Sequence, residues 1–382
     1  MKTRIMVLFV LSSCALFACG GNSSESKSGQ AEITDANGRT LHLYPGSYKK
    51  IVCIGAGALR LYSYIGDNAD LAGVEDIDNL DAEGRPAMFD GVARPYFIAN
   101  KDAYRGLPSC GKGGPNAQQA EAEKILSCQP DLVISEYEDV EKADALQKQL
   151  GLPVITLKYG SNGVFDDRAL SSISLIGKVL AKESKAETLL KFVDDAKKDI
   201  QSRTKNLASD KKVYICGLGN WGTTNHLMTA KNYTPFQVAN IHNIADDILS
   251  NPGVQAIEKE TLIANFSNID TVFIDAAAVK NIKPLYKEDP TLFDGCKAVE
   301  NGEVYLQMAH NAYYTNLETA LMNTYYNAKI IHPTAFEDVD MVAKTNEITK
   351  AFLGKELAQD IFSYPQSFGG YQKIDVKEFF NA

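Results

Sequence analysis

Short apolar runs alternate with helix-like segments in two stretches of this chain, and this alternation restricts the fold more than any other feature. In residues 50–158 the runs include IVCI and LVI, and in residues 209–306 they include VYIC and TVFI. Strands that alternate with helices in this way form βαβ units, in which the strands lie parallel in one sheet. We therefore expect an α/β fold of two lobes, each with a parallel central sheet.

The two stretches also share sequence details, which indicates one Rossmann-like unit used twice. Their first strands read IVCIGAG and VYICGLG, and each ends in Gly-x-Gly. Later, AEKILSCQPDLVI resembles KETLIANFSNIDTVFI, in which a glutamate opens a helix that leads through a turn into an apolar strand. The pattern predicts strands at 50–54, 71–74, 131–134, 154–157, 212–216, 271–274 and 303–306, and helices at 58–65, 118–127, 140–150, 235–241 and 259–265.

The stretch between the two halves has the pattern of one long helix. Residues 166–205 contain no proline and only one glycine, Gly177, and their apolar residues recur at roughly helical spacing. One helix of this length would extend about 57 Å, at about 1.5 Å per residue, which is enough to cross both lobes. The alternative is two consecutive helices with a break near Lys182–Ser184. A single connecting helix predicts that the lobes hinge little on binding.

Residues 1–19 have the features of an export signal. Lys2 and Arg4 precede a short apolar run, and the segment ends in LFAC. The run is too short to span a bilayer, and its ending resembles a bacterial lipobox, in which Cys19 is acylated and becomes the new N-terminus. The alternative is a plain signal peptide with an incidental cysteine. Residues 20–31 begin with a glycine- and serine-rich stretch, so we expect a flexible linker to a lipid anchor outside the cytoplasm.

The charge of the chain argues against nucleic acid as a partner. Without Lys2 and Arg4, 37 of the 39 basic residues remain against 48 acidic ones, a net charge of −11. Such a charge is also unfavourable for binding to anionic membrane surfaces.

Five cysteines follow Cys19 in the sequence, and none has the spacing of a zinc site. Cys53 and Cys216 lie in apolar runs, where we expect buried, unreactive thiols. Cys110 and Cys128 flank a short segment. In an oxidising compartment these two residues could form a disulfide, and the alternative is that both are free thiols.

Patterns that would indicate an enzyme are incomplete or absent. Gly55 and Gly57 follow a strand, and Glu75 lies about 20 residues further on, as in a dinucleotide-binding fingerprint. However, Arg60 stands where that fingerprint has its third glycine. Neither G-x-S-x-G nor H-E-x-x-H occurs. We therefore expect a protein that binds rather than catalyses, without an intrinsic cofactor.

Taken together, residues 32–380 resemble the class III solute-binding proteins of ABC importers, which carry ferric siderophores, haem and cobalamin. ITDANGRTLHLYPGSYKKIVCIG resembles the opening hairpin and first strand of that family, and AEKILSCQPDLVISE resembles its E-x-I-L-x-x-x-P-D-L-V-I signature. PYFIANKDAYRGLPSCGKGGPN resembles a subgroup of iron or metal-complex receptors. The resemblance implies a signal peptide at 1–19, a linker at 20–31, lobes at 32–162 and 207–382, and one connecting helix within 163–206.

The resemblance also implies a cargo and partners. We expect a monomer that captures a metal chelate, most simply a ferric siderophore or a related iron complex, and delivers it to a membrane permease and its ATPase. Haem, cobalamin, a metal ion or an oxyanion are alternatives on the same scaffold. A surface lipoprotein that holds haem or metal without a permease is another, and an exported hydrolase is a more distant one.

Ligand contacts are expected where strands end at the cleft between the lobes, because ligands of parallel sheets bind beyond the carboxyl ends of the strands. Aromatic faces suit flat or apolar cargo, and tyrosine and histidine can ligate iron. Ordinary core packing is the alternative for each aromatic residue. The candidates are Gly57, Tyr96, Tyr104 and Tyr137 in the first lobe and Trp221, His226, His310, Tyr313 and Tyr314 in the second.

In the family, one exposed glutamate in each lobe pairs with arginines of the permease. Glu123 stands seven residues before Pro130 in the matching motif, and Glu260 has the corresponding place in the second lobe. Glu121 and Glu258 are the near alternatives. Each could also be an ordinary first-turn glutamate that the helix dipole stabilises.

Overall fold

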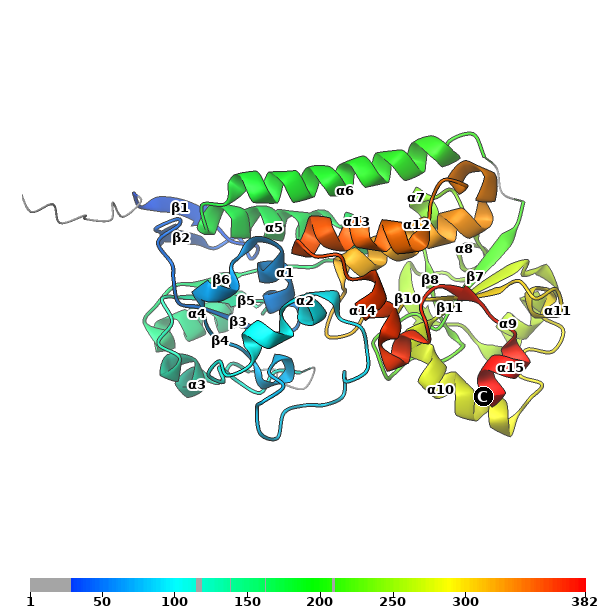
Figure 1. Ribbon diagram of the computed structural model, residues 1–382, viewed down its shortest axis with the longest axis horizontal. Helices are drawn as coiled ribbons and strands as arrows, with labels where there is room; N and C mark the ends of the chain where they lie inside the picture. The colour runs from blue at the N-terminus through cyan, green and yellow to red at the C-terminus, as the bar shows by residue number, and fades with distance from the viewer. Residues whose placement is uncertain (1–28, 115–118, 138, 162, 208–209) are drawn as a thin grey trace, which may run out of the picture.

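Two α/β lobes lie side by side in the computed structural model and are bridged along one edge by helices (Figure 1). The structure describes residues 29–114, 119–137, 139–161, 163–207 and 210–382. The predicted export signal, with Cys19, and most of the predicted linker lie outside the described residues. The expectation of two lobes with parallel central sheets is confirmed.

The first lobe is built on a four-stranded sheet with the order β4-β3-β5-β6, in which all neighbours are parallel. Its strands are short apolar runs buried on both faces, as parallel strands covered by helices require. The elements of this lobe are β1 (Ala31–Thr34), β2 (Thr40–Leu43), β3 (Ile51–Ile54), α1 (Ala58–Ile65), η1 (Asn68–Asp70), β4 (Leu71–Gly73), η2 (Asp76–Asp78), α2 (Pro95–Tyr104), α3 (Ala122–Ser127), β5 (Leu132–Ser135), α4 (Val140–Leu150) and β6 (Val154–Thr156).

The second lobe contains a five-stranded sheet with the order β13-β12-β11-β7-β9, in which only β13 is antiparallel to its neighbour. A separate antiparallel pair, β8 and β10, lies beside it. The elements are β7 (Lys212–Cys216), β8 (Met228–Lys231), α7 (Thr234–Val238), β9 (His242–Asn243), α8 (Ile244–Ile248), β10 (Gly253–Ala256), α9 (Lys259–Asn265), η4 (Phe266–Asn268), β11 (Thr271–Asp275), α10 (Ala276–Glu288), α11 (Lys297–Glu300), β12 (Val304–Gln307), α12 (Leu317–Ile331), η5 (Pro333–Phe336), α13 (Met341–Leu353), α14 (Ala358–Ser363), η6 (Pro365–Ser367), β13 (Gln372–Lys373) and α15 (Val376–Asn381).

The connection between the lobes differs from the single helix predicted over 166–205, and that prediction is wrong. After η3 (Gly163–Phe165), α5 runs over Asp167–Val179 and α6 over Glu183–Thr204, so the alternative of two helices is confirmed. Ala181 adopts a left-handed φ of 52°, and the amide of Lys182 donates to the Gly177 carbonyl oxygen at 2.7 Å. This is a Schellman helix end, which usually carries glycine in the left-handed position.

The helix α6 is therefore the part of this stretch that bridges the lobes. Its 22 residues extend about 33 Å, and Figure 1 shows the helix in green along the top of both lobes, with α5 folded back beneath it. No helix in the described ranges is both long and apolar enough to cross a bilayer.

The cysteines are buried in the lobes as free thiols. All five that follow Cys19 are free, so the disulfide considered between Cys110 and Cys128 is not formed. Each of these two thiols is directed to backbone oxygens instead: the Cys128 thiol donates to Lys124 at 3.3 Å and the Cys110 thiol to Cys53 at 3.9 Å. The expectation of buried thiols at Cys53 and Cys216 is confirmed.

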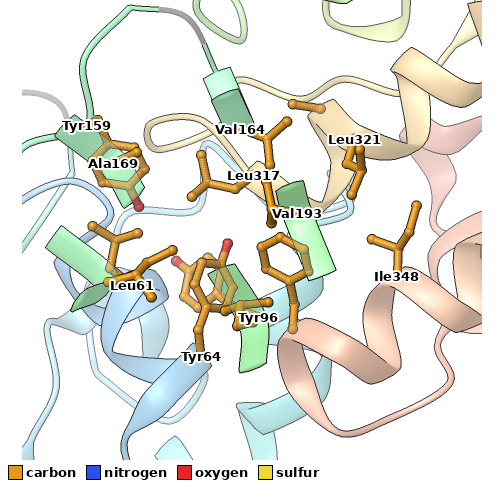
Figure 2. Packing of buried hydrophobic residues seen from close by; sticks show 14 of the residues in the cluster. Leu61, Tyr64, Tyr96, Tyr159, Val164, Ala169, Val193, Leu317, Leu321 and Ile348 are labelled. Carbon is orange, nitrogen blue, oxygen red and sulfur yellow. The ribbon is translucent and has the colours of Figure 1, made fainter. Parts of the chain in front are cut away.

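One hydrophobic core extends across both lobes beneath α6. Figure 2 shows Leu61 and Tyr64 of α1 packed with Val193 of α6, Leu317 of α12 and Ile348 of α13, all members of one buried cluster. The two lobes share apolar contacts rather than meeting only at a solvated surface. Separation of the lobes would expose this core, at a cost of about 25 cal/mol for each Å² of apolar surface.

A buried guanidinium ties the two lobes together next to this core. Arg60 of α1 has no exposed surface and donates to the carbonyl oxygens of Ala312 and Tyr313, both at 2.9 Å. It also donates to the Thr315 carbonyl oxygen at 3.1 Å and to Asn316 Oδ1 at 3.0 Å. One side chain of the first lobe thus donates hydrogen bonds to four oxygen atoms of the second-lobe loop formed by residues 312–316.

We expect Arg60→Met to destabilise the fold strongly, because it leaves several buried acceptors without a donor. The free energy of unfolding should fall by about 3 kcal/mol or more, since each unsatisfied buried acceptor costs about 1–3 kcal/mol. Urea denaturation followed by Trp221 fluorescence measures the change. The matched control is Arg105→Met, whose guanidinium is 48% exposed and pairs with Asp81 at the surface. Its effect should stay below about 1 kcal/mol, and equal losses in both variants would contradict the role of Arg60.

Candidate functional site

A cleft of about 960 Å³ lies between the end of the first lobe and the second lobe. Its first-lobe side is the segment that leads from β6 through η3 into α5, and α6 contributes Lys197. The other side is formed by the loops after β7, β8 and β12 and by the start of β10. The lining residues are Gly160, Ser161, Gly163, Val164, Phe165, Lys197, Leu218, Asn220, Ala230, Lys231, Asn232, Tyr233, Thr234, Pro235, Gln237, Pro252, Gly253, Val254, His310, Asn311, Tyr314, Thr315 and Ala320.

The charge of this cleft is opposite to that of the chain. Its described lining contains two lysines, Lys197 and Lys231, and no carboxylate, although the chain carries a net charge of −9. Lys231 is held in place by the carbonyl oxygen of Asp246, to which its ammonium donates at 3.0 Å. Lys197 lies 5.6 Å from the centre of the Phe165 ring. The rest of the lining combines amide and hydroxyl side chains, such as Asn220 and Thr234, with apolar and aromatic ones, such as Val254 and Phe165, so it suits an anionic ligand with an apolar body.

The topology of the second sheet brings His310 to the cleft beside a buried carboxylate. Asp275 ends β11, and Gln307 ends the neighbouring parallel strand β12 in register with it. His310 follows three residues later, with Nδ1 at 3.3 Å from Asp275 Oδ2. The Gln307 amide donates to the same Oδ2 at 3.1 Å. Asp275 Oδ1 accepts from the amide of Ala277 at 2.9 Å and caps α10.

Behind the cleft wall, loops that follow strands of the two lobes meet directly. The Tyr313 hydroxyl donates to Glu75 Oε2 at 2.6 Å and accepts from the Gly114 amide at 3.1 Å. Glu75 Oε1 accepts from the Gly55 amide at 3.0 Å. Burial raises the pKa of Glu75 to about 7, although the hydrogen bonds from Tyr313 and Gly55 oppose the shift; Asp78 and Asp76 add to it.

Of the predicted ligand residues, His310 and Tyr314 line the cleft, and several others lie just behind its wall. The Tyr314 ring packs on Tyr159 with ring centres 4.6 Å apart, and the Tyr159 hydroxyl donates to the Gly57 carbonyl oxygen at 2.8 Å. Gly57 is therefore covered by Tyr159. Tyr313 is buried between the lobes against Glu75.

The remaining predicted residues lie elsewhere in the described part of the chain. Tyr96 and Tyr104 are buried on α2, where their hydroxyls meet Asp78 at 2.7 Å and Ser63 at 2.9 Å. Trp221 donates through Nε1 to the Met88 carbonyl oxygen at 3.2 Å. It does not line the cleft, although Leu218 and Asn220 of the same loop do. Tyr137 lies beside Gly55.

His226 is the predicted residue that the structure separates most clearly from the cleft. It is buried with its ring 6.0 Å from that of Phe293, and burial lowers its pKa. Histidine is a common ligand, which is why His226 was predicted to bind. Its burial depends on apolar residues distant in sequence, such as Phe293, which the local pattern does not reveal.

Sequence reasoning missed Lys197, Lys231 and Tyr159. Lys197 lies within a helix whose surface is rich in charge, so nothing in its neighbourhood distinguishes it. Lys231 could have been found, because it ends a strand-like run just before the helix start at Thr234. Among the described residues, no group of three or more His, Cys, Asp and Glu side chains is arranged to hold a metal ion.

The two glutamates predicted for docking are exposed at equivalent positions of the two lobes. Glu123 lies in the first turn of α3 and Glu260 in the first turn of α9. The nearby Glu121 is instead engaged, since it accepts from the Lys112 amide at 2.6 Å and pairs with Lys124 at 3.0 Å. Glu258 is exposed.

The buried carboxyl of Glu75 should make stability fall as the pH rises. Its pKa is higher in the folded chain than in the unfolded chain, so the folded state retains the proton longer. This stabilisation is complete below pH 4.5 and is lost as the pH rises through about 7. The loss should approach about 3 kcal/mol, since one pKa unit corresponds to about 1.4 kcal/mol.

Urea denaturation at several pH values tests this against Glu75→Gln, which keeps the shape without the charge. From pH 5 to pH 8 the unchanged protein should lose stability relative to Glu75→Gln, so the unfolding free energy of the variant minus that of the unchanged protein should increase. Glu83→Gln, at an exposed glutamate, serves as the control. A constant difference for Glu75→Gln across this range would contradict the shift.

Comparisons with known proteins agree with this architecture. The Bacillus subtilis (strain 168) protein YvrC, an uncharacterized ABC transporter substrate-binding lipoprotein, is 34% identical over 98 residues. The match covers 24% of this chain and spans only 30% of that relative. A periplasmic solute binding protein from Veillonella parvula DSM 2008 has a TM-score of 0.65 at 18% identity, covering 88% of this chain and 96% of its own.

A second solved structure with the same fold is the Haemophilus influenzae molybdate periplasmic binding protein MolA, bound to molybdate. Its TM-score is 0.63 at 16% identity, and the match covers 85% of this chain and 98% of that one. Residues 51–309 match the family described as periplasmic binding protein, which is more than half of the chain. The predicted family resemblance is thereby confirmed, and the chain belongs to the periplasmic binding protein family.

Proposed function

We propose that this protein is the extracytoplasmic receptor of an ABC importer and that it captures an anionic metal chelate in the cleft between its lobes. The observation that carries the proposal is the cleft lined by Lys197, Lys231 and His310 without a carboxylate among its described residues. A lipid anchor at Cys19 would hold the receptor at the membrane. A ferric siderophore or a related iron complex is the cargo we favour.

The size and lining of the cleft support a chelate rather than a bare ion. Its volume of about 960 Å³ is at the upper end of the range of about 300–1,000 Å³ typical of small-molecule sites. Phe165, Tyr233 and Val254 offer apolar contacts to an organic ligand shell. The lysines can neutralise catecholate or carboxylate groups of that shell. Haem would also fit by size, whereas cobalamin is larger and offers little negative charge to the lysines.

Binding should depend on the two lysines and on salt. We expect the double variant Lys197→Met and Lys231→Met to weaken binding of a ferric tris-catecholate roughly tenfold, because two exposed charge pairs are together worth up to about 2 kcal/mol. Raising the salt concentration should weaken binding to the unchanged protein more than to the variant. Lys198→Met is the matched control, because Lys198 neighbours Lys197 on α6 but pairs with Asp194.

Calorimetry with a panel of ferric tris-catecholate, haemin, cyanocobalamin and molybdate measures these affinities. Tight binding of at least one metal complex, unchanged by the protein, is the expected result. Failure of the entire panel to bind, or steady chemical turnover of a bound compound, would contradict the proposed function.

Delivery to a permease should depend on the two exposed glutamates. Charge-assisted pairs of glutamate with arginine are strong and geometrically selective. We expect Glu123→Arg with Glu260→Arg to abolish stimulation of the importer ATPase by the loaded receptor, while ligand affinity stays unchanged. Glu337→Arg, at a glutamate beyond η5, is the control for added charge. Retained stimulation by the double variant would contradict docking at these sites.

A further inference from the structure

The pair of His310 and Asp275 has a geometry that the proposed cargo would use directly. Asp275 is 1% exposed and accepts hydrogen bonds from the Ala277 amide and the Gln307 side chain, and His310 lies beside it. His310 Nδ1 is buried, lies 3.3 Å from Asp275 Oδ2 and has no hydrogen-bond partner among the described residues.

This arrangement assigns different roles to the two ring nitrogens. A proton on Nδ1, facing Asp275, leaves the lone pair on Nε2. Since Nδ1 is buried and the side chain is 16% exposed where it lines the cleft, the accessible part of the ring lies away from Asp275. A carboxylate behind an imidazole fixes the orientation of the ring, as it does behind histidines that ligate metals.

We propose that His310 binds the metal of the cargo through Nε2, with Asp275 as its positioning residue. This inference rests on the proposed function, because the metal arrives inside a chelate. One imidazole supplies one bond, so the chelate provides the other ligands. His310 displaces a water from the metal, and neither a proton nor an electron is transferred in that step.

The inference narrows the class of substrate. A chelate that leaves a coordination position open, or fills it with water, can bind His310, whereas a complex saturated by its own ligand cannot. Imidazole nitrogen suits iron, nickel and copper. Lys197 and Lys231 favour a negative charge on the same chelate. The cleft would thus select anionic, coordinatively unsaturated complexes over saturated ones of similar size.

Two matched pairs of probes test this with the full mature chain, free of any affinity tag. Nickel nitrilotriacetate leaves open positions on the metal, whereas nickel ethylenediaminetetraacetate fills them. Haemin has an axial position, whereas metal-free protoporphyrin IX has none. Calorimetry gives the affinities, and absorbance of haemin reports the ligation of its iron by imidazole.

The variants are His310→Ala, Asp275→Asn and the control His42→Ala. Asparagine retains the ability to cap α10, so Asp275→Asn separates orientation of the imidazole from helix capping. His42 is 61% exposed in its side chain and lies on β2, outside the cleft lining. Thermal melts monitor the folding of each variant.

We expect His310→Ala to weaken binding of nickel nitrilotriacetate and haemin at least tenfold and to remove the imidazole band of haemin. Added imidazole should restore that band. Asp275→Asn should weaken the same two probes to a smaller extent, and His42→Ala should change neither. The saturated and metal-free probes should bind more weakly than their partners, with affinities that His310→Ala leaves unchanged.

The inference is overturned if nickel nitrilotriacetate and haemin both fail to bind, or if they bind His310→Ala as tightly as the unchanged protein. In either case, binding of a saturated ferric complex in the wider panel would leave the proposed function standing. If that panel also fails to bind, the proposed function falls with the inference.

Discussion

The buried guanidinium of Arg60 is the interaction on which the rest of the structure depends. It belongs to the first lobe, but the carbonyl groups that accept its hydrogen bonds belong to residues 312–316 of the second lobe. Its charge has no exposed surface and is compensated by backbone dipoles and neighbouring tyrosines. A buried charge of this kind tolerates only one arrangement of its partners, so the relative position of the lobes is fixed at this point.

The same interaction shapes the wall of the cleft. Tyr313 and Tyr314 both adopt left-handed backbone conformations, with φ of 55° and 69°. Such conformations are costly for residues other than glycine, at about 1–3 kcal/mol each, and persist only where the surroundings enforce them. Arg60 holds the carbonyl oxygens of this loop, and Glu75 holds the Tyr313 hydroxyl. His310 and Tyr314 are therefore presented to the cleft by a loop that the other lobe has already ordered.

The sequence patterns predicted the elements far better than they predicted the site. The ranges expected for α1, α4, β7 and α9 match the observed bounds, because buried apolar runs and helix caps such as Asp139 are local signals. The break between α5 and α6 lacked its usual signal, since Ala181 occupies a position where glycine is common. Burial of the predicted aromatic residues depends on contacts between segments far apart in sequence, which periodicity does not reveal.

These features also favour a particular mode of recognition. The shared core beneath α6 and the Arg60 contacts oppose separation of the lobes, and limited hinging on binding stays a prediction. A receptor whose lobes move little cannot improve its contacts by closing around a ligand. Its selectivity must therefore come from cleft-lining side chains that are already in position before binding. Such preorganisation reduces the entropy lost on binding. Under the proposed function, it also restricts the choice of ligand to those whose charge and open coordination position match groups fixed in advance, and the ordered loop that carries His310 would supply such groups.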